Sequence, residues 1–478
     1  MKRAKKLYAL LGVLVVICVI TFAVSKYEEE KEIIKNSDEI ILTLDAESVN
    51  KLSWEYAETS LSFHKDEGWF YDDDEAFPVD EEKIHELLNV FGEFGVSFII
   101  EEVQDYSAYG LDDPECTIQI ETEEETYEIL LGDFSTMDSE RYVSIGDGNV
   151  YLVSNDPMAT YEIKLEDMIL HDELPNFETV TEVAFTGAEE YEIFYEEEST
   201  ATYCEDDVYF TEQGGNVVPL DTDNVDSYLD TISSLGLEEY ASYNVSDKEL
   251  ESFGLDNPEL TVTVQHAWED AETEEEVEDT FVLHVSRDPE EAAKAAEEAA
   301  KAKETEEEDT ESEEEEEITA YARVGESQIV YKLDGDAYRT LMAASCNDLR
   351  HQEVLSADFA DIYQIDISLE GNTYIITSEE EDDTKVYYYG EEELDIYDLK
   401  SSLNTMYAEE FTDEKAKDKE EIAVTVYLEN DNFPQVELQF YRYDGEHCLA
   451  VVDGEPVCLV LRSAVVDVIE AVNAIVLN

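Results

Sequence analysis

The chain has 478 residues, and its 124 acidic against 28 basic side chains give a formal net charge of -96 at neutral pH. This charge repels nucleic-acid phosphates, so it excludes a nucleic-acid-binding function. Hydrophobic residues still make up 43% of the chain and aromatic residues 11%, which is enough apolar material to form folded cores. At roughly 100–200 residues per domain, the length predicts two to four folded units.

The N-terminus has the pattern of a membrane anchor. Four basic residues precede an uncharged apolar run over residues 7–24, and an acidic stretch follows it. Eighteen helical residues at about 1.5 Å each span about 27 Å, which is just enough to cross the hydrocarbon core of a bilayer. The basic side of a span faces the cytoplasm, so the rest of the chain is expected outside.

We therefore expect residues 1–6 to be a cytoplasmic tail, residues 7–24 a single transmembrane helix, and residues 25–45 a juxtamembrane linker. The predicted location is the cell membrane, with an extracytoplasmic body. A cleaved secretory signal is the alternative, because Ala23-Val24-Ser25 resembles a cleavage site.

An internal repeat organises the body. Residues 109–118 recur as residues 253–262, an offset of 144 positions, and both copies read aromatic-Gly-Leu-Asp-x-Pro-Glu followed by alternating apolar residues. The proline after Asp-x indicates a turn, and the alternation indicates a strand that follows it. We interpret this Gly-Leu-Asp-x-Pro motif as structural rather than functional.

Strand-like alternation precedes each copy of the motif, and a helical pattern with i, i+3, i+4, i+7 spacing lies between. The apolar helix positions are Ile84, Leu87, Leu88 and Phe91 in the first copy and Val225, Tyr228, Leu229 and Ile232 in the second. Asp80 is the expected cap of the first helix, and Asp221 or Asp223 that of the second. A hairpin pattern follows the motif in both copies, over residues 142–153 and 321–333.

These patterns predict three repeat units of α+β class, each an antiparallel sheet with helices. Repeat 1 covers residues 46–178, repeat 2 residues 179–358, and repeat 3, a degenerate copy without the turn motif, residues 359–478. Residues 415–421 stand in repeat 3 where the turn would be. A last apolar helix is expected over residues 464–475.

Repeat 2 contains a low-complexity acidic insertion. The offset between repeats 1 and 2 grows from 144 to 180 positions, as Val150-Tyr151 and Val330-Tyr331 show, and residues 287–317 account for the difference. Residues 290–303 have the Ala/Glu/Lys composition of a helix, and residues 304–317 are almost entirely acidic. We expect a mobile surface excursion from a strand connection.

Two cysteines are candidates for a disulfide. Cys448 and Cys458 flank Asp453-Gly454 in a predicted hairpin. A three-residue loop with Gly454 in the left-handed conformation would place the two cysteines opposite each other. The alternative is two unrelated strand cysteines.

The anchor, the Gly-Leu-Asp-x-Pro turn, and a Leu131-Gly132-Asp133 step before the hairpin of Tyr142 resemble a bacterial family catalogued as domain of unknown function 4340. The resemblance covers about residues 46–355 strongly and repeat 3 weakly. Repeat 2 departs from it at Val285-Ser286-Arg287, and repeat 3 lacks the turn. The resemblance implies an envelope protein found alongside ABC-type transport systems like those of gliding motility, as an auxiliary component. The family defines no catalytic residues to carry over.

No pattern for catalysis or cofactor binding stands out. The seven histidines are scattered without an H-E-x-x-H motif, and we find no G-x-S-x-G elbow, no phosphate-binding loop and no calcium-binding loop. His171 and His351 occupy matching places only after a one-residue shift, and we interpret both as surface or junction residues. The sequence therefore predicts no metal, no cofactor and no enzymatic activity.

Three classes of function remain open. The first is an accessory or assembly protein whose partners are the membrane and the permease and ATPase subunits of an ABC transporter. The alternative is a module that binds cell wall, glycan or another surface, suggested by tyrosine-rich strands such as residues 387–389. An enzyme is the third and least supported class.

Overall fold

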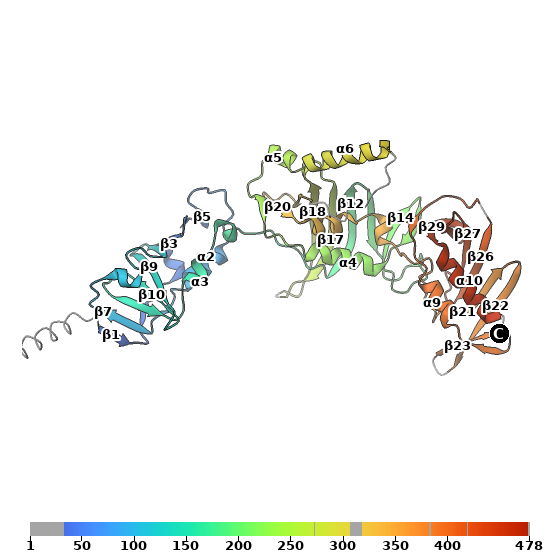
Figure 1. The fold of residues 1–478 in the computed structure, drawn as a ribbon, viewed down its shortest axis with the longest axis horizontal. Helices are drawn as coiled ribbons and strands as arrows, with labels where there is room; N and C mark the ends of the chain where they lie inside the picture. Colours follow the sequence, from blue (N-terminus) through green and yellow to red (C-terminus); the bar gives the residue numbers. More distant parts are fainter. Residues whose placement is uncertain (1–32, 272, 306–317, 382–383, 418, 477–478) are drawn as a thin grey trace, which may run out of the picture. The chain divides into compact units, whose positions relative to one another are not determined.

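A computed structural model describes residues 33–271, 273–305, 318–381, 384–417 and 419–476. In this part of the chain, three antiparallel sheets of nine strands each follow one another along the sequence (Figure 1). The chain divides into two compact units, residues 1–171 with the first sheet and residues 172–478 with the other two. The predicted α+β class with dominant antiparallel sheet is confirmed.

No helix within the described ranges is long and apolar enough to cross a membrane. The predicted tail, residues 1–6, and the predicted transmembrane helix, residues 7–24, lie outside the described residues.

The sheet of repeat 1 has the strand order β1-β7-β11-β10-β9-β8-β3-β4-β5. Its strands are β1 (Ile33–Asn36), β3 (Val49–Tyr56), β4 (Thr59–Lys65), β5 (Trp69–Tyr71), β7 (Phe98–Glu101), β8 (Cys116–Thr122), β9 (Thr126–Ser135), β10 (Glu140–Ser144) and β11 (Val150–Val153). The short pair β2 (Ile40–Leu42) and β6 (Phe94–Gly95) lies beside it, with the helices η1 (Ala46–Ser48), α2 (Glu81–Asn89), η2 (Tyr106–Tyr109), α3 (Met158–Tyr161) and η3 (Leu165–Met168).

The prediction of a linker over residues 25–45 was wrong for its second half. β1 pairs with β7, and β2 pairs with β6, so these residues extend the fold of repeat 1. With three or four residues each, the two strands are too short to show an alternating pattern.

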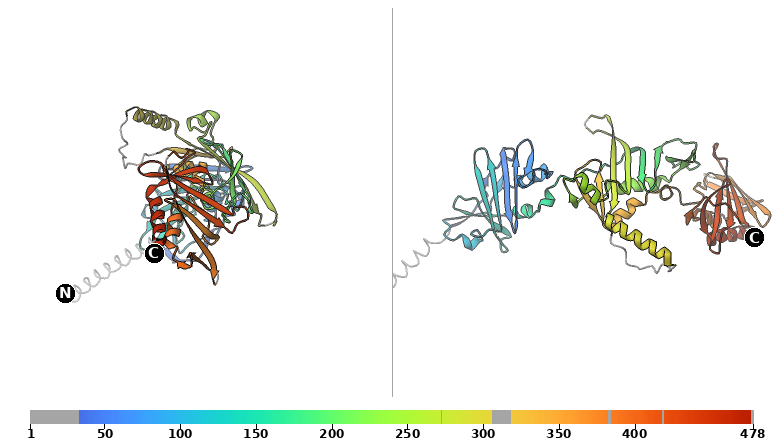
Figure 2. Two further views of the ribbon diagram at one scale, coloured as in Figure 1. Left: turned by 90° about the vertical axis from the view of Figure 1, so that its right-hand side faces the viewer. Right: turned by 90° about the horizontal axis from the view of Figure 1, so that it is seen from above.

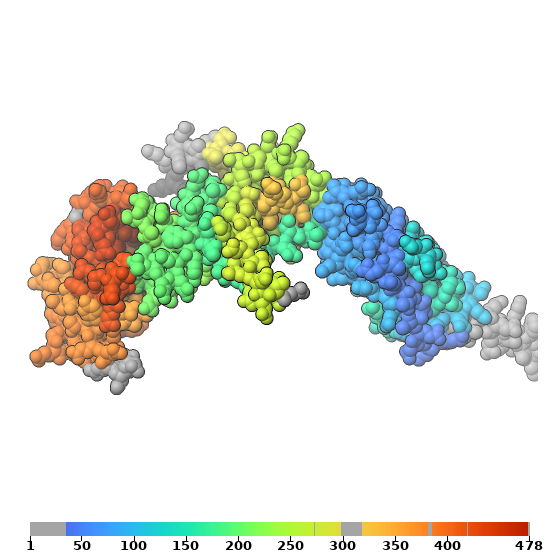
Figure 3. Space-filling view, turned by 180° about the vertical axis from the view of Figure 1, so that it is seen from behind, coloured from blue at the N-terminus to red at the C-terminus, as the bar shows by residue number. Residues whose placement is uncertain are grey.

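The sheet of repeat 2 has the order β15-β14-β13-β12-β17-β18-β19-β20-β16. Its strands are β12 (Thr179–Gly187), β13 (Tyr191–Tyr195), β14 (Tyr209–Gln213), β15 (Asn216–Pro219), β16 (Tyr240–Ser242), β17 (Leu260–Glu269), β18 (Glu276–Arg287), β19 (Ala320–Val324) and β20 (Val330–Leu333). Its helices are α4 (Thr222–Ser233), α5 (Asp247–Ser252), α6 (Pro289–Thr305), α7 (Gly335–Met342) and α8 (Cys346–Leu349). Figure 3 shows the end of the β17–β18 hairpin protruding from the body of this repeat.

The sheet of repeat 3 has the order β24-β23-β22-β21-β26-β27-β28-β29-β25. Its strands are β21 (Ile362–Leu369), β22 (Asn372–Glu381), β23 (Thr384–Tyr389), β24 (Glu392–Leu394), β25 (Glu410–Phe411), β26 (Glu420–Leu428), β27 (Gln435–Arg442), β28 (His447–Val452) and β29 (Glu455–Leu461). Its helices are α9 (Tyr397–Asn404) and α10 (Arg462–Val476), the second of which is the predicted last helix.

Eight strands of each sheet share one topology, and the ninth differs: repeat 1 adds β1 beside β7, whereas repeats 2 and 3 add β15 and β24 at the opposite edge. In each sheet, the first long strand lies in the interior and pairs with the strand that follows the helical crossover: β3 with β8, β12 with β17, and β21 with β26. Each pairing also has a register shift near the start of the first strand, at Asn50, Thr181 or Tyr363. Because a bulge of this kind is a local feature of the fold, its recurrence supports three copies of one unit.

The crossover helices are confirmed where their apolar spacing predicted them. Ile84, Leu87 and Leu88 of α2 are buried, and so are all four of the predicted apolar positions of α4. Asp80 caps α2 and Asp221 caps α4, each by accepting hydrogen bonds from two backbone N–H groups of the first turn. The capping residue of the second helix is therefore Asp221 rather than Asp223.

The two glycine motifs of repeat 1 pack against each other. Gly110 has a φ of 68°, a conformation that glycine adopts without strain. A Cβ on Gly110 would lie 2.8 Å from the backbone nitrogen of Asp133, and a Cβ on Gly132 would lie 2.2 Å from the carbonyl oxygen of Tyr109. Both positions therefore need glycine because the turn approaches the neighbouring strand too closely for a side chain.

Arg141 joins the same two motifs. Its side chain is buried, and its Nη1 donates to the Glu115 carboxylate at 2.7 Å and to the Gly132 carbonyl at 2.6 Å. Its Nε donates to Asp156 at 2.7 Å. Glu115 ends the turn motif, so this contact ties the motif to the neighbouring strands.

Repeat 2 reaches a similar arrangement with different residues. Ser286 stands in place of the glycine in the Leu-Gly-Asp step, and its Oγ donates to the Gly254 carbonyl at 2.9 Å and accepts from the Glu259 N–H at 3.1 Å. Glu259 also accepts from the Tyr338 hydroxyl at 2.7 Å. The departure of repeat 2 from the family pattern is thus accommodated by new hydrogen bonds around the same turn.

The insertion starts as a helix, as its composition indicated. α6 leaves the sheet of repeat 2 between β18 and β19 (Figure 2). Asp288 caps its first turn, and the Glu291 side chain accepts hydrogen bonds from the backbone and the hydroxyl of Thr319. The base of the insertion is therefore held at both ends. Residues 306–317, most of the acidic tract, lie outside the described residues.

The candidate disulfide between Cys448 and Cys458 is not formed in the structure. Cys448 and Cys458 are both buried free thiols. The turn contains two residues rather than three, Asp453 and Gly454, both with positive φ, as in a two-residue hairpin. A bulge at Val457 shifts the register further and pairs Cys448 with Val460 and Cys458 with Ala450, so the cysteines are not opposite each other.

We predict that Gly132→Ala lowers the free energy of unfolding of repeat 1 by roughly 1–3 kcal/mol, because the added methyl group forces the turn away from the strand. Gly95→Ala is the control, since a Cβ there meets only ordinary contacts. The measurement is urea denaturation of the full chain in detergent. Equal denaturation midpoints for both variants would show that the close approach has no energetic role.

Candidate functional site

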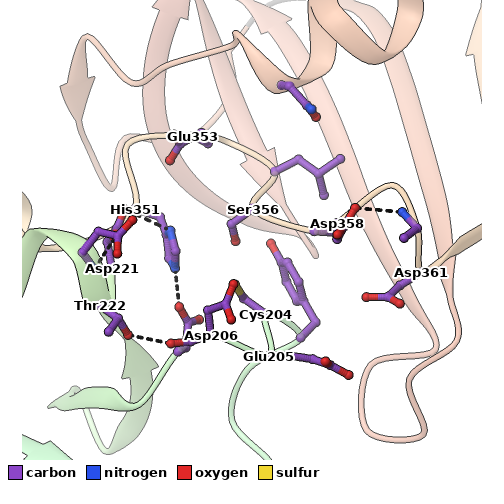
Figure 4. A pocket seen from close by; sticks show the side chains of 17 residues that line it. Cys204, Glu205, Asp206, Asp221, Thr222, His351, Glu353, Ser356, Asp358 and Asp361 are labelled. Atoms are coloured by element: carbon purple, nitrogen blue, oxygen red, sulfur yellow. Dashed lines mark hydrogen bonds and ion pairs between the residues drawn. The ribbon is translucent and has the colours of Figure 1, made fainter. Parts of the chain in front are cut away.

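A large polar cavity lies in the second compact unit, where repeat 2 meets the segment that leads into repeat 3 (Figure 4). Its volume is about 920 Å³. Three chain segments form most of it, namely the loop before β14, the start of α4, and residues 351–361, and Asn404 of α9 completes the lining. The lining side chains that can titrate or bind a metal include Cys204, Asp207, Asp221, His351 and Glu353.

The loop before β14 places Asp207 inside the protein. The Asp207 side chain is buried, and it accepts a hydrogen bond from the Thr202 hydroxyl at 2.5 Å. Thr222 of α4 holds the same loop, because its hydroxyl donates to the Asp206 carbonyl at 2.8 Å and accepts from the Val208 N–H at 3.1 Å. The position of Asp207 is therefore fixed by both the loop and the helix.

The junction segment is attached to the start of α4. The backbone N–H of the helix cap Asp221 donates to the Leu349 carbonyl at 3.0 Å, two residues before His351. The same contact exists in repeat 1, where the N–H of the cap Asp80 donates to the Met168 carbonyl at 2.9 Å. The attachment of the junction to the helix cap is thus shared by the first two repeats, while the histidine cluster belongs to the second.

His351 lies between two carboxylates. Its Nε2 is 2.8 Å from Asp207 Oδ1, and its Nδ1 is 3.5 Å from Asp221 Oδ2 (Figure 4). Burial alone would lower the pKa of His351, but the hydrogen bond and charge of Asp207, together with the charges of Asp221 and Glu353, raise it above its ordinary value. The imidazole therefore favours its protonated form more than a free histidine does.

Cys204 contributes a thiol to the same cluster. Burial and the nearby Asp207 carboxylate raise the pKa of Cys204 to about 11. The thiol is protonated at neutral pH, which makes it a weak nucleophile.

The arrangement has the residue types of a metal site. Ligand atoms of Cys204, Asp207 and His351 lie within 4.8 Å of one another, and so do those of Asp221, His351 and Glu353. Thiolate, imidazole and carboxylate are the ligands that zinc and similar ions take. The cluster can also act without an ion, as a charged hydrogen-bond network that holds the junction to repeat 2.

The sequence did not predict this site. His351 was interpreted as a junction residue, which is correct for its position but omits its contact with Asp207, 144 residues earlier. Cys204 was not among the candidate residues, and Asp221 was recognised only as a possible helix cap. The other residues considered beforehand lie elsewhere: His171 is in the first compact unit, and Cys448 and Cys458 are in the core of repeat 3.

The charge state of His351 predicts a pH dependence. Because its pKa is raised on folding, His351 stabilises the fold fully below its unfolded pKa of about 6.5, and this contribution is lost as the pH rises through the folded value. His351→Gln should therefore lower the urea midpoint most at pH 6 and less at pH 9.

His284 provides a control of opposite sign, since burial and then the charge of Arg323 lower its pKa. The wild-type chain loses the contribution of neutral His284 as the pH falls, so His284→Gln should be least harmful at pH 6. Parallel pH profiles for the two variants would contradict this assignment.

Comparisons with known proteins place the chain in a family. The family described as Domain of unknown function (DUF4340) matches residues 69–207 and 211–425. The match includes both copies of the turn motif and extends into repeat 3, where the sequence pattern indicated a weak resemblance. No curated protein and no solved structure matches the chain. Because the family matches more than half of its length, the chain belongs to the DUF4340 family.

Proposed function

We propose that the chain is a membrane-anchored envelope protein that serves as an accessory or assembly component of an ABC-type transport system. In this proposal residues 7–24 cross the membrane, the N-terminus is cytoplasmic, and the three repeats work outside the cytoplasm. The specific role within the transport system is that of a binding scaffold rather than a catalyst.

The observation that carries the proposal is the repetition of one eight-strand arrangement within three successive nine-stranded sheets. Repeated units enlarge the surface of a protein without requiring a new fold for each contact. The shared parts are those of architecture, namely the strand order, the bulge and the attachment of the junction to the helix cap in the first two repeats. The cluster of titratable side chains around His351 occurs at one junction, so it is an addition to the repeated architecture and not part of it.

The acidic composition supports an extracytoplasmic, solvated surface. Much of the charge lies on exposed strands and turns, as in residues 196–198, which are all exposed glutamates. Like charges of this density keep a protein soluble and prevent non-specific association. The family resemblance to envelope proteins that accompany transporters supports the same role.

The alternative of a wall or glycan-binding module has weaker support. It rested on tyrosine-rich strands, and Tyr387 in the most prominent run is buried, with its hydroxyl donating to the Phe359 carbonyl at 2.8 Å. A tyrosine in this position packs the core of repeat 3 and is not free to stack on a sugar ring.

Affinity purification tests the proposal. The full chain, tagged and extracted from its native membranes with a mild detergent, should bring down an ATPase and a permease that mass spectrometry identifies. A chain reduced to residues 1–45 with the same tag is the control and should not retain them. Recovery of the full chain without transporter subunits would overturn the proposal.

A further inference from the structure

We propose that Cys204, Asp207 and His351 form a binding site for a divalent transition-metal ion of the zinc type. The site lies at the junction between repeats 2 and 3, where the ion would connect the loop before β14 to the segment that enters repeat 3. This inference is independent of the proposed transport role.

The three ligands converge from distant parts of the chain. Cys204 and Asp207 come from one short loop, and His351 comes from a segment that follows seven further strands. Their ligand atoms nevertheless lie within 4.8 Å of one another. Metal–ligand bonds of about 2.0–2.3 Å place the ligands of a tetrahedral ion roughly 3–4 Å apart, so only a small closure is needed.

The side chains that line the cavity include ligand types that transition metals prefer. Eight carboxylates line the cavity, and among the described residues that line it there is no lysine or arginine. A purely acidic cluster would suit calcium or magnesium, which prefer oxygen ligands. The thiol of Cys204 and the imidazole of His351 at its centre instead favour zinc, cobalt or nickel.

Neighbouring side chains hold two of the ligands in position. Asp207 is 3% exposed, and the Thr202 hydroxyl fixes its second oxygen. His351 presents Nε2 towards Asp207, while its other nitrogen faces the Asp221 carboxylate at 3.5 Å. A histidine that binds zinc through one nitrogen commonly directs the other to a carboxylate, which holds the ring in orientation. Asp221 is therefore placed as a positioning residue.

Metal binding replaces protons in this site. The ion takes the place of the proton between His351 Nε2 and Asp207, and it displaces the proton of the Cys204 thiol. Three bonds form, from the ion to sulfur, oxygen and nitrogen, and the displaced protons go to the solvent. The open cavity leaves room for water as a further ligand.

Cobalt is a suitable probe because its absorption spectrum reports both coordination geometry and thiolate binding. The full chain in detergent, freed of metal with a chelator, is titrated with Co²⁺ in excess Mg²⁺, which occupies the surface carboxylates. We expect one strong site with a thiolate-to-cobalt charge-transfer band and the intense visible bands of a tetrahedral ion. Zn²⁺ should then displace the cobalt and abolish these bands.

Variants connect the signal to the residues. Cys204→Ser should remove the charge-transfer band, and His351→Gln should weaken cobalt binding at least about tenfold. His64→Gln is the matched control, because His64 also pairs with an aspartate, Asp72, at 2.6 Å and should leave the spectrum unchanged. Circular dichroism tests whether each variant is folded. If His351→Gln does not fold, the spectrum of Cys204→Ser alone tests the proposal.

Two results would overturn the proposal. One is a cobalt spectrum without a thiolate band, which would show binding to surface carboxylates only. The other is a thiolate band that persists in folded Cys204→Ser, which would assign the metal to another cysteine.

Discussion

The structure depends on one long-range pairing that occurs in each repeat. The first long strand pairs antiparallel with the strand that follows the helical crossover, as β3 does with β8. This pairing joins two sets of hairpins into one sheet, because the strands before and after the crossover are otherwise connected only to their own neighbours. Closing such a loop costs conformational entropy, so the buried faces of the two strands must offset it. Leu52, Trp54, Ile118 and Ile120 supply this apolar surface in repeat 1.

The turn motif packs beside this pairing in repeats 1 and 2, but the pairing also forms without it. Repeat 1 brings Gly110 and Gly132 into close approach, and repeat 2 replaces the second glycine with Ser286 and a pair of hydrogen bonds. Repeat 3 has no such motif and still forms the pairing of β21 with β26, with the bulge in the same place. The alternating apolar pattern of the central strands is therefore the common determinant, and the turn chemistry varies around it.

Local patterns predicted most of the fold. The helices α2 and α4 follow from apolar spacing and an aspartate cap, and the order of elements follows from comparing the repeats. The edge strands β1 and β2 could not be predicted, since three or four residues show no period. The predicted pairing of Cys448 and Cys458 was wrong because the turn is one residue shorter than expected and a bulge at Val457 shifts the register by one more residue.

The candidate site could not be predicted because its parts have no local signal. Asp207, Asp221 and His351 meet only when the topology places the loop before β14 beside the start of α4 and the junction segment. Each residue has an ordinary local explanation, as a loop, cap or junction residue. The distances of 2.8 and 3.5 Å from the His351 nitrogens to two carboxylates appear only in three dimensions.

The central claim, that one arrangement of eight strands is built three times, is tested most directly by amide hydrogen exchange along the full chain in detergent. The account predicts strong protection of the central pairs β3–β8, β12–β17 and β21–β26, because their amides are hydrogen-bonded within buried sheets. Repeat 3 should be protected in the same strands as the other two, although it lacks the turn motif. Exchange of β21 and β26 at the rate of an unfolded chain, with repeats 1 and 2 protected, would contradict it.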